Sequence, residues 1–332
     1  MLHQTVSIAM ATYNGQRFLG DQLASLGSQS LKPLELIVTD DRSSDATLGM
    51  LRSFAKRAPF PVRVVRNEEN LGYRLNFIKA ASLCSGSVIA FCDQDDVWEQ
   101  HKVAAVTRHF SGSDDWAVSH DFSVFFDDCR PPIASYFDFL RLSGLPPACS
   151  IKGCTTAFRR ELIAKFGWPD RSAKINHDTW VCLTSALLRK RGYIHDSLIN
   201  YRIHGRNASG VILGGDRPVG RIMRSLSLPP FTSKDELDLT LGFLIPNFIP
   251  DDNHALVRNL VVSSSGDAPV KDRQSALDAL ERNLAIRRFV TGELYARPIR
   301  RTFRAFRLFL QRAYRNGDGV QGLLLDVLGR RV

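Results

Sequence analysis

The sequence of 332 residues predicts an α/β domain with a mostly parallel β-sheet and helices on both faces of the sheet. Two observations predict this fold class. Short runs rich in Val and Ile alternate with segments of helical period through residues 6–92. Polar or acidic residues follow these runs where strands would end. Alternating strands and helices form parallel sheets with right-handed crossovers, so we expect such a sheet here.

Four strands and three helices make up this predicted half of the domain. The strands are expected at residues 6–10, 34–39, 62–66 and 87–92. Apolar residues at helical spacing predict the helices between them. Their stripes contain Phe18, Leu19, Gln22, Leu23 and Leu26, then Leu48, Leu51, Phe54 and Ala55, then Leu75, Ile78, Lys79 and Leu83.

Clusters of polar residues stand directly after three of the predicted strands. They are residues 11–15, 40–45 and 93–96, of sequence ATYNG, DDRSSD and DQDD. Ligands of open α/β sheets bind outside the carboxyl ends of the strands. These clusters therefore predict a binding site at one edge of the sheet. The alternative interpretation is that Asp, Asn and Ser only form turns and helix N-caps there.

The Asp93, Asp95 and Asp96 carboxylates suit a hard divalent cation, Mg²⁺ or Mn²⁺. Such an ion keeps coordination sites open for substrate phosphates and stabilises a departing diphosphate as a Lewis acid. Neither GxGxxG nor GxxxxGK[ST] occurs, so phosphates would be held by cations rather than a backbone cradle. Arg74, just after the third strand, is a candidate diphosphate cation, or a residue of a solvated helix face.

The amino-acid composition excludes fewer classes of protein than the polar clusters do. A 44% hydrophobic and 23% charged chain is typical of globular proteins. The net charge of +10 fits an anionic substrate, a nucleic acid or an anionic membrane. The six cysteines form no CxxC pair, which favours reduced thiols in a cytoplasmic protein. No apolar stretch is long enough to predict a transmembrane helix or a signal peptide.

The chain changes character along its length. Residues 1–210 are expected to form the catalytic domain, and residues 211–332 a helical, basic extension. Within 297–315 there are seven arginines, no acidic residue and an apolar stripe at helical spacing. This segment, Arg297 to Arg315, predicts a helix that lies on an anionic membrane surface or packs on the catalytic domain. No nucleic-acid-binding fold accompanies it, which disfavours a nucleic-acid partner.

Six motifs occur in the order found in family 2 glycosyltransferases, across residues 5–210. They are residues 6–15 (VSIAMATYNG), 40–45 (DDRSSD), 70–72 (NLG), 91–98 (FCDQDDVW), 177–180 (HDTW) and 201–205 (YRIHG). Together they resemble this family, and within it the bacterial rhamnosyltransferase-like branch. The resemblance implies the GT-A fold, a Rossmann-like, mostly parallel sheet flanked by helices.

The resemblance also implies roles for individual residues. Asp178 corresponds to the catalytic base, and Asp93 and Asp95 to the metal-binding carboxylates. His204 would approach the metal or the diphosphate. The residues implied to contact the nucleotide-sugar donor are Thr12, Tyr13, Asn14, Asp41 and Asp96, to which we add Arg74.

Alternatives remain for several of these residues. Asp178 at a predicted helix start could be a first-turn acid favoured by the helix dipole. His204 could be a structural histidine. Trp98 and Trp180 could stack on sugars, although core positions are commoner for aromatic residues near helix starts. Residues 153–162 resemble the acceptor-side segment of the family, with a helix beginning near Arg159.

The predicted function is inverting, metal-dependent transfer of a sugar from a nucleotide-diphosphate donor to a hydroxyl of an acceptor. The donor would be a dTDP- or UDP-sugar, with dTDP-L-rhamnose suggested by the branch. The acceptor would be a saccharide or lipid-linked saccharide in cell-surface polysaccharide assembly. The rival hypotheses are a sugar-phosphate nucleotidylyltransferase and a non-catalytic module that binds sugar nucleotides. The enzyme would be cytoplasmic or peripheral on the inner face of the cytoplasmic membrane.

Overall fold

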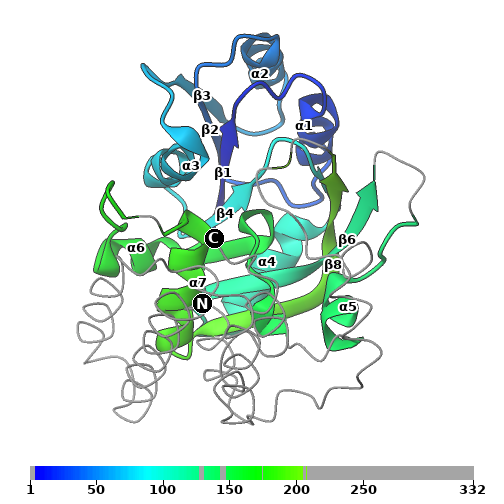
Figure 1. Ribbon diagram of the computed structural model, residues 1–332, viewed down its shortest axis with the longest axis vertical. Helices are drawn as coiled ribbons and strands as arrows, with labels where there is room; N and C mark the ends of the chain where they lie inside the picture. Colours follow the sequence, from blue (N-terminus) through cyan, green and yellow to red (C-terminus); the bar gives the residue numbers. More distant parts are fainter. Residues whose placement is uncertain (1–3, 127–130, 143–146, 174, 205–206, 208–332) are drawn as a thin grey trace, which may run out of the picture.

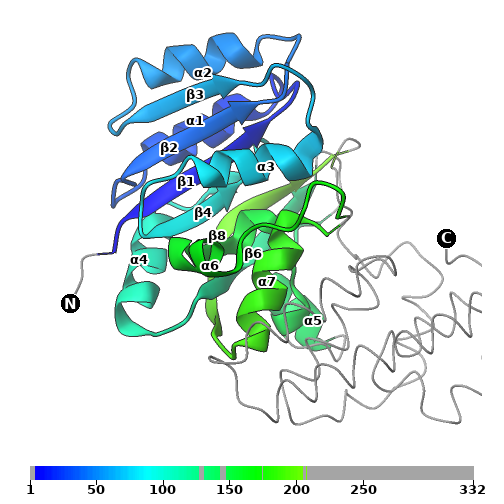
Figure 2. The same ribbon diagram turned by 90° about the vertical axis from the view of Figure 1, so that its left-hand side faces the viewer.

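One eight-stranded sheet with helices on both faces forms the core of the molecule (Figures 1 and 2). The computed structural model describes residues 4–126, 131–142, 147–173, 175–204 and 207. The predicted α/β fold with a mostly parallel sheet is confirmed. The predicted extension, residues 211–332 with its basic segment, lies outside the described residues, so the division into two domains stays a prediction.

The first half of the sheet follows the predicted alternation of strands and helices. Its elements are β1 (Val6–Thr12), α1 (Leu19–Gly27), β2 (Glu35–Asp40), α2 (Thr47–Ala55), β3 (Val62–Arg66), α3 (Gly72–Ser82) and β4 (Val88–Cys92). All pairings among these strands are parallel, in the order β3-β2-β1-β4. The strand order reverses at β1, which lies between β2 and β4. Such a reversal is where α/β sheets place their ligands.

The second half completes the sheet with mixed pairings. Its elements are β5 (Val97–Trp98), α4 (Lys102–Gly112), β6 (Ala117–Phe126), α5 (Tyr136–Leu142), the 3-10 turns η1 (Pro147–Cys149) and η2 (Gly153–Thr155), β7 (Thr156–Arg159), α6 (Arg160–Phe166), α7 (His177–Leu187) and β8 (Arg191–Ile203). β7 lies antiparallel between β4 and β6. β8 pairs parallel with β6 and antiparallel with the short β5. The sheet order is therefore β3-β2-β1-β4-β7-β6-β8-β5.

Each face of the sheet has its own apolar core, because successive strand residues point to opposite faces. Ile8, Met10 and Val38 pack on one face under α1, α2, α4 and α5. Ala9, Ile37 and the other odd-numbered residues of these strands pack on the opposite face under α3, α6 and α7. Strands buried on both faces explain the continuous Val and Ile runs in the sequence.

The buried face of α3 differs from the predicted one. The sequence stripe was expected to centre on Leu75 and Ile78, yet both are only partly buried. Asn76, Phe77, Ala80 and Ala81 are the buried residues. Asn76 sets this rotation, because its buried side chain donates to Thr39 O at 3.0 Å and bonds Asn67 at 2.9 Å. The Asn76 amide, which the sequence stripe did not include, thus connects α3 to the end of β2 from a buried position.

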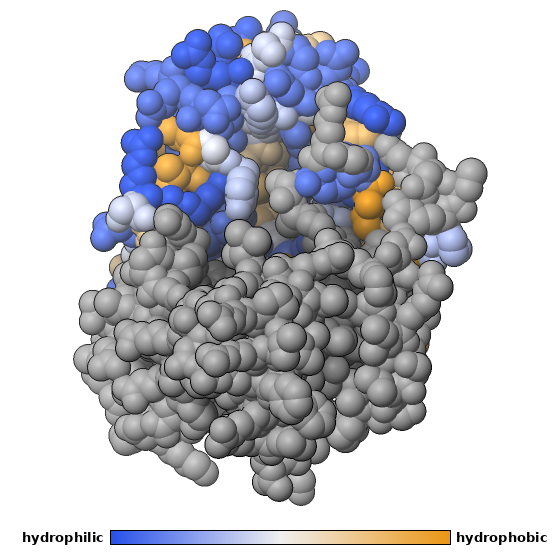
Figure 3. All heavy atoms as spheres, viewed as in Figure 1, coloured by the Kyte–Doolittle hydropathy of each residue, from blue (hydrophilic) through white to orange (hydrophobic). Residues whose placement is uncertain are grey.

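The described surface on the face seen in Figure 3 is mostly hydrophilic, with small apolar patches. Five cysteines are described, and all are buried free thiols, as predicted. None of the described helices has the length and hydropathy to cross a membrane.

Candidate active site

The turns after β1 and β4 are fastened to each other at the edge where the strand order reverses. Gln94 Oε1 accepts from Tyr13 N at 2.9 Å, and Gln94 Nε2 donates to Tyr13 O at 3.0 Å. A Cβ at Gly15 would collide with the Gln94 amide, so any other residue there would displace the Gln94 side chain from its hydrogen bonds to Tyr13. Tyr13 itself is about half exposed. The Tyr13 ring is therefore available to a ligand while its backbone is fixed.

The turn after β1 also bonds the turn after β2. Asn14 has a left-handed backbone, with φ of 46°, a conformation that Asn tolerates better than most residues. Its amide N–H donates to Ser43 Oγ at 2.9 Å, and its side-chain oxygen accepts from Ser44 N at 2.9 Å. Thr12 is buried and donates to Asp40 Oδ2 at 3.1 Å. Three predicted donor-binding residues, Thr12, Tyr13 and Asn14, thus lie in one hydrogen-bonded region.

Asp41 organises the loop before α3. Its buried carboxylate accepts from Asn67 Nδ2 at 2.8 Å, Leu71 N at 2.8 Å and Gly72 N at 2.9 Å. Since a carboxylate offers roughly four acceptor positions, one remains for another donor. Its predicted contact with the nucleotide base stays a prediction, and its structural role was not foreseen.

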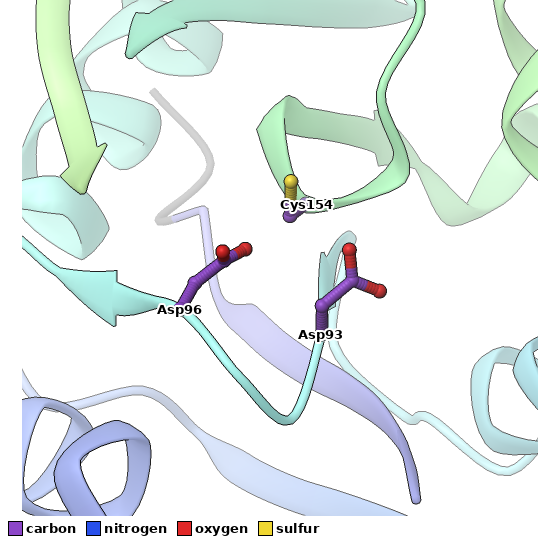
Figure 4. A group of neighbouring side chains, drawn as sticks. All are labelled: Asp93, Asp96 and Cys154. Atoms are coloured by element: carbon purple, nitrogen blue, oxygen red, sulfur yellow. The ribbon is translucent and has the colours of Figure 1, made fainter. Parts of the chain in front are cut away.

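The turn after β4 brings two of the predicted carboxylates to a cysteine (Figure 4). Asp93, Asp96 and Cys154 point toward one another, and their ligand atoms all lie within 4.8 Å of each other. Asp96 and Cys154 are fully buried, whereas Asp93 is partly exposed. Asp96 Oδ1 accepts from Arg202 N at 3.1 Å, and Asp96 Oδ2 has no hydrogen-bond partner among the described residues.

Asp95 meets the end of β8 instead. Asp95 Oδ2 lies 3.0 Å from His204 Nε2, and the His204 ring stacks on Phe18 with 4.5 Å between centroids. Arg202 Nε donates to Asp95 O at 3.1 Å. The structure therefore brings the predicted pair Asp95 and His204 together, at the same turn as Asp93 and Asp96.

The electrostatics of this turn favour a cation. Burial, followed by the neighbouring carboxylates, raises the pKa of both Asp93 and Asp96 above the usual range of aspartate. Lys102 supplies one internal positive charge nearby, and burial lowers its pKa to about 8. Lys152 adds a second positive charge near Asp93, and three carboxylates against two ammonium groups still leave an excess of negative charge. Together with the unpartnered oxygen of Asp96, this fits a bound divalent ion.

Asp178 lies in the first turn of α7, and its charge contributes to the raised pKa of Asp93. It is partly exposed, and its Oδ1 accepts from Thr179 N at 2.7 Å. The preceding His177 is buried, stacked on Phe77 at 4.3 Å and edge-on to Phe91 at 4.7 Å. This packing fixes the start of α7 and with it the carboxylate of Asp178.

Arg74 lies on the same side as Asp178. Arg74 Nη2 donates to Arg171 O at 2.7 Å, while Nη1 is buried without a partner among the described residues. The exposed Tyr73 beside it donates to Asn176 Oδ1 at 2.8 Å. Burial is the main cause of the raised pKa of Tyr73. The hydrogen bond to Asn176 lowers this pKa, and the negative charge of Asp178 raises it further. A role of Arg74 toward a diphosphate stays a prediction.

Sequence reasoning missed several residues of this site. Gln94, Tyr73, Lys102 and Cys154 were not singled out, although Cys154 and Gln94 stand inside motifs that were. Trp98 and Trp180 are buried, which confirms their interpretation as core residues rather than sugar-stacking aromatics. The DxD-like pattern in the sequence predicts the carboxylates, but it does not indicate which strand lies opposite them in the fold.

Known proteins resemble this chain in sequence. The sequence model of the family described as Glycosyl transferase family 2 matches residues 7–167. An uncharacterized glycosyltransferase of Nostoc sp. is 26% identical over 212 residues, 61% of this chain and 66% of the relative. The dTDP-rhamnosyl transferase RfbG of Shigella flexneri is 25% identical over 169 residues, 47% of this chain and 56% of the relative. These matches span about two thirds or less of the relatives' own length.

Solved structures resemble the fold. TarS residues 1–349 of S. aureus, determined in complex with UDP-GlcNAc, has a TM-score of 0.52 at 15% identity, covering 88% of this chain and 93% of that one. The mannosyltransferase PcManGT of Pyrobaculum calidifontis, in complex with GDP-Man and Mn²⁺, also has a TM-score of 0.52, at 18% identity, covering 86% and 81%. These likenesses support the GT-A fold.

Proposed function

Residues 7–167 belong to glycosyl transferase family 2, and on this premise we propose that the protein transfers a sugar from a nucleotide-diphosphate donor to an acceptor hydroxyl, with inversion at the anomeric carbon. The observation that carries the proposal is the convergence of carboxylates at one edge of the sheet. Asp93, Asp95 and Asp96 follow β4, and Asp178 is close enough to raise the pKa of Asp93. Inverting transfer needs such a pair of functions, a diphosphate site and a base.

Asp178 is the base in this proposal. Inverting transfer requires that an acceptor hydroxyl lose its proton as it attacks, and one carboxylate within hydrogen-bond reach suffices. Asp178 is partly exposed, so an acceptor can reach it, and its hydrogen bonds within the described part of the chain, from Thr179 N and Thr179 Oγ1, are both made through Oδ1. The packing of His177 holds this carboxylate in place.

Asp93, Asp95 and His204 are proposed to hold Mn²⁺ or Mg²⁺ near the donor diphosphate. When bound, the ion would neutralise charge on the departing diphosphate. The surplus of buried carboxylates and the unpartnered Asp96 Oδ2 support a cation at this turn. One of the structural neighbours was solved with Mn²⁺ and GDP-Man.

The donor is proposed to be a pyrimidine nucleotide sugar bound by the turns after β1 and β2. Thr12, Tyr13, Asn14 and Asp41 lie there, and Asp96 lies across the reversal point after β4. The similarity to a dTDP-rhamnosyl transferase favours dTDP-L-rhamnose, and TarS with UDP-GlcNAc makes a UDP-sugar the alternative. Asp41 does not separate the two, because uracil and thymine carry the same imide N–H.

The acceptor is proposed to be a saccharide or lipid-linked saccharide in cell-surface polysaccharide assembly. A relative named as a putative teichuronic acid biosynthesis glycosyltransferase, in Bacillus subtilis, is 34% identical over 98 residues. The basic segment from Arg297 to Arg315 would bring the enzyme to an anionic membrane where lipid-linked acceptors reside. Co-sedimentation with anionic but not neutral vesicles, lost when these arginines are replaced by Gln, is the expected result.

Replacement of Asp178 by Asn tests the base. Asn keeps the acceptor for Thr179 N but cannot take a proton, so we expect transfer to fall by about 100- to 10,000-fold while donor affinity is retained. Transfer rate and donor binding by calorimetry measure the two effects. The exposed Asp138, in α5, gives a matched control, and Asp138→Asn should change neither. Donor binding lost together with transfer would contradict the assignment.

Thermal stabilisation by a panel of nucleotides separates the candidate functions. We expect dTDP, UDP or their sugar conjugates to raise the melting temperature in the presence of Mn²⁺, because a ligand of the folded state stabilises it by mass action. A non-catalytic module would bind nucleotide but show no transfer that depends on Asp178. A nucleotidylyltransferase would instead release pyrophosphate from a nucleoside triphosphate and a sugar phosphate.

A further inference from the structure

The register of the sheet sets Cys154 opposite Asp93. β4 and β7 are antiparallel, with Ile89 paired to Phe158 and Ala90 to Ala157. Continued beyond the end of β4, the same register brings position 93 across from position 154. The η2 turn, which precedes β7, thus delivers a thiol to the first carboxylate of the Asp93–Asp96 turn. The pairing of β4 with β7 and the η2 turn together bring these two residues to each other, although 61 positions of sequence separate them.

A buried lysine fixes the cysteine in this position. Lys102 Nζ donates to Cys154 O at 2.7 Å, and the ammonium lies 3.7 Å from the centre of the Trp98 ring. The following residues are tied to Lys152 O, which accepts from Thr155 Oγ1 at 3.0 Å and Thr156 Oγ1 at 2.9 Å. The backbone around Cys154 is therefore held on both sides, and its thiol has little freedom to turn away.

The side chains of Asp93, Asp96 and Cys154 together form a site that a bound cation would complete. Asp93, Asp96 and Cys154 present their ligand atoms within 4.8 Å of one another (Figure 4). Asp96 is fully buried, and its Oδ2 has no hydrogen-bond partner among the described residues. The Cys154 thiol beside Asp96 is only a weak donor, so a buried carboxylate oxygen with no stronger partner is costly, and a bound cation would satisfy it.

We propose that Asp93, Asp96 and Cys154 together bind the divalent cation of the donor site, with Cys154 as a thiolate ligand. The inference rests on the proposed function but gives the ion a different set of ligands: Asp93 is kept, and Asp96 and Cys154 take the place of Asp95 and His204. A sulfur ligand shifts preference from Mg²⁺ toward borderline ions such as Zn²⁺ and Co²⁺. The identity of the ion thus depends on a residue outside the acidic motif.

Binding requires the thiol to release its proton. When the ion binds, the proton of the Cys154 thiol and any proton held by Asp93 or Asp96 would pass to solvent, and the electron pair of the former S–H bond would remain on sulfur and be shared with the ion. Two carboxylates and one thiolate then offset the charge of the divalent ion and leave one negative charge. The ammonium of Lys102, which bonds the Cys154 carbonyl, balances that remaining charge.

Cobalt binding to the full chain tests this ligand set. A thiolate bound to Co²⁺ gives a near-ultraviolet charge-transfer absorption that oxygen ligands do not give. The reduced, metal-free protein, with and without UDP, should show this band on addition of Co²⁺. It should be absent from Cys154→Ser and Cys154→Ala. Asp96→Asn should weaken or abolish it.

Competition between ions gives a second measure. Loss of a residue that hydrogen-bonds a metal ligand typically weakens metal binding by about 10- to 100-fold, and loss of the ligand itself should weaken it at least as much. We therefore expect Cys154→Ser to weaken Zn²⁺ binding by about 10- to 100-fold or more. Mg²⁺ binding should change by only a few-fold, because serine still offers oxygen. Cys84→Ser is the control. Cys84 is buried in the apolar core beneath α3, and its thiol donates to Ala80 O. This variant should retain the cobalt band.

Two results would overturn the inference. One is a cobalt band of full intensity in Cys154→Ser, and the other is cobalt binding to the unsubstituted protein without a charge-transfer band. UDP and dTDP binding, measured on the same samples, separates this failure from that of the proposed function. Nucleotide binding that persists without the band rejects only the thiolate, whereas absence of nucleotide binding under every metal condition rejects the function.

Discussion

At the scale of single residues, the acidic turn carries several distinct tasks that its sequence does not distinguish. Asp95 pairs with His204, Asp96 receives the backbone N–H of Arg202, and Asp93 faces Cys154. Gln94, between them, holds the neighbouring turn at Tyr13. Four consecutive side chains thus have four different partners. The effect of a substitution at any of these four positions should therefore be compared with the effect of substituting the residue that it contacts.

His177 provides a prediction about stability and pH. Burial lowers its pKa to about 4, below the roughly 6.5 expected in the unfolded chain. Between these values the unfolded state binds more protons, so stability rises with pH and is complete above about pH 6.5. We expect a loss of up to about 3 kcal/mol as pH falls toward 4, measured by denaturant unfolding.

The variant His177→Phe isolates this contribution. Phe fills the space beside Phe77 and Phe91 but does not titrate, so the pH dependence over this window should flatten. His101→Gln, at an exposed position before α4, is the matched control and should keep the slope of the unsubstituted protein. An equal slope in His177→Phe would show that other groups account for the effect.

At the scale of elements, the site is assembled by two strands that meet the same turn from different directions. β7 faces Asp93 through its preceding η2 turn, and β8 faces Asp95 and Asp96 through its last residues. α7 begins beside η2 and contributes Asp178. The close approach of η2 to α7 leaves little room at Gly153, where a Cβ would lie 3.0 Å from His177 Nε2, so that a neighbour would have to shift slightly.

Gly153→Ala should therefore disturb the base without touching the donor turns. The His177 ring is packed between two Phe rings and cannot retreat, so α7 and Asp178 must shift by a few tenths of an ångström. Since small misplacement of a catalytic group can cost up to about 100-fold, we expect slower transfer with donor affinity retained. Single-turnover rates and donor calorimetry measure both quantities.

Gly49→Ala is the matched control for this change. A Cβ at Gly49, in α2, meets no atom within 4 Å, and alanine favours a helix by roughly 0.5–1 kcal/mol. It should raise the melting temperature and leave transfer unchanged. Full activity in Gly153→Ala would show that the start of α7 adapts freely.

The sequence predicts some elements well and others not at all, for physical reasons. β1, β2 and β4 are buried on both faces, so their Val and Ile runs are unmistakable, whereas the edge strand β3 is only partly buried. β6 and β8 were not predicted, because β6 buries His120 and Asp121 and β8 carries charged and polar residues along its length. The roles of Asp178 and His204 came from family resemblance. Lys102 could not be foreseen, since lysine is almost never fully buried.

At the scale of the whole molecule, every predicted site residue lies within the sheet and its connections, between Thr12 and His204. The described residues form an apolar core on each face of the sheet, beneath helices α1 to α7. The last strand, β8, ends directly at the site, and Asn207 Oδ1 accepts from His204 N at 2.6 Å. Donor binding is therefore expected to need only this part of the chain.

A chain ending at residue 210 tests this expectation. We expect it to fold cooperatively and to bind a nucleoside diphosphate with affinity similar to that of the full chain, as measured by calorimetry. Extension of a lipid-linked acceptor on vesicles should fall, if residues 211–332 bring the enzyme to the membrane. A folded, monomeric truncated chain without nucleotide affinity would contradict the proposed boundary.

The pairing of β4 with β7 has a consequence for how this protein can change over evolutionary time. A residue inserted or deleted between Cys154 and Phe158 would displace one relative to the other, so either the thiol would lose its place or Phe158 would turn out of its core. A length change that displaced Phe158 would be eliminated for failure to fold, before any effect on chemistry was tested. Point substitution at position 154 carries no such penalty. Replacement of the side chain at position 154 can therefore change which ion is preferred, while the packing of the hydrophobic core keeps this position in the same place in the fold.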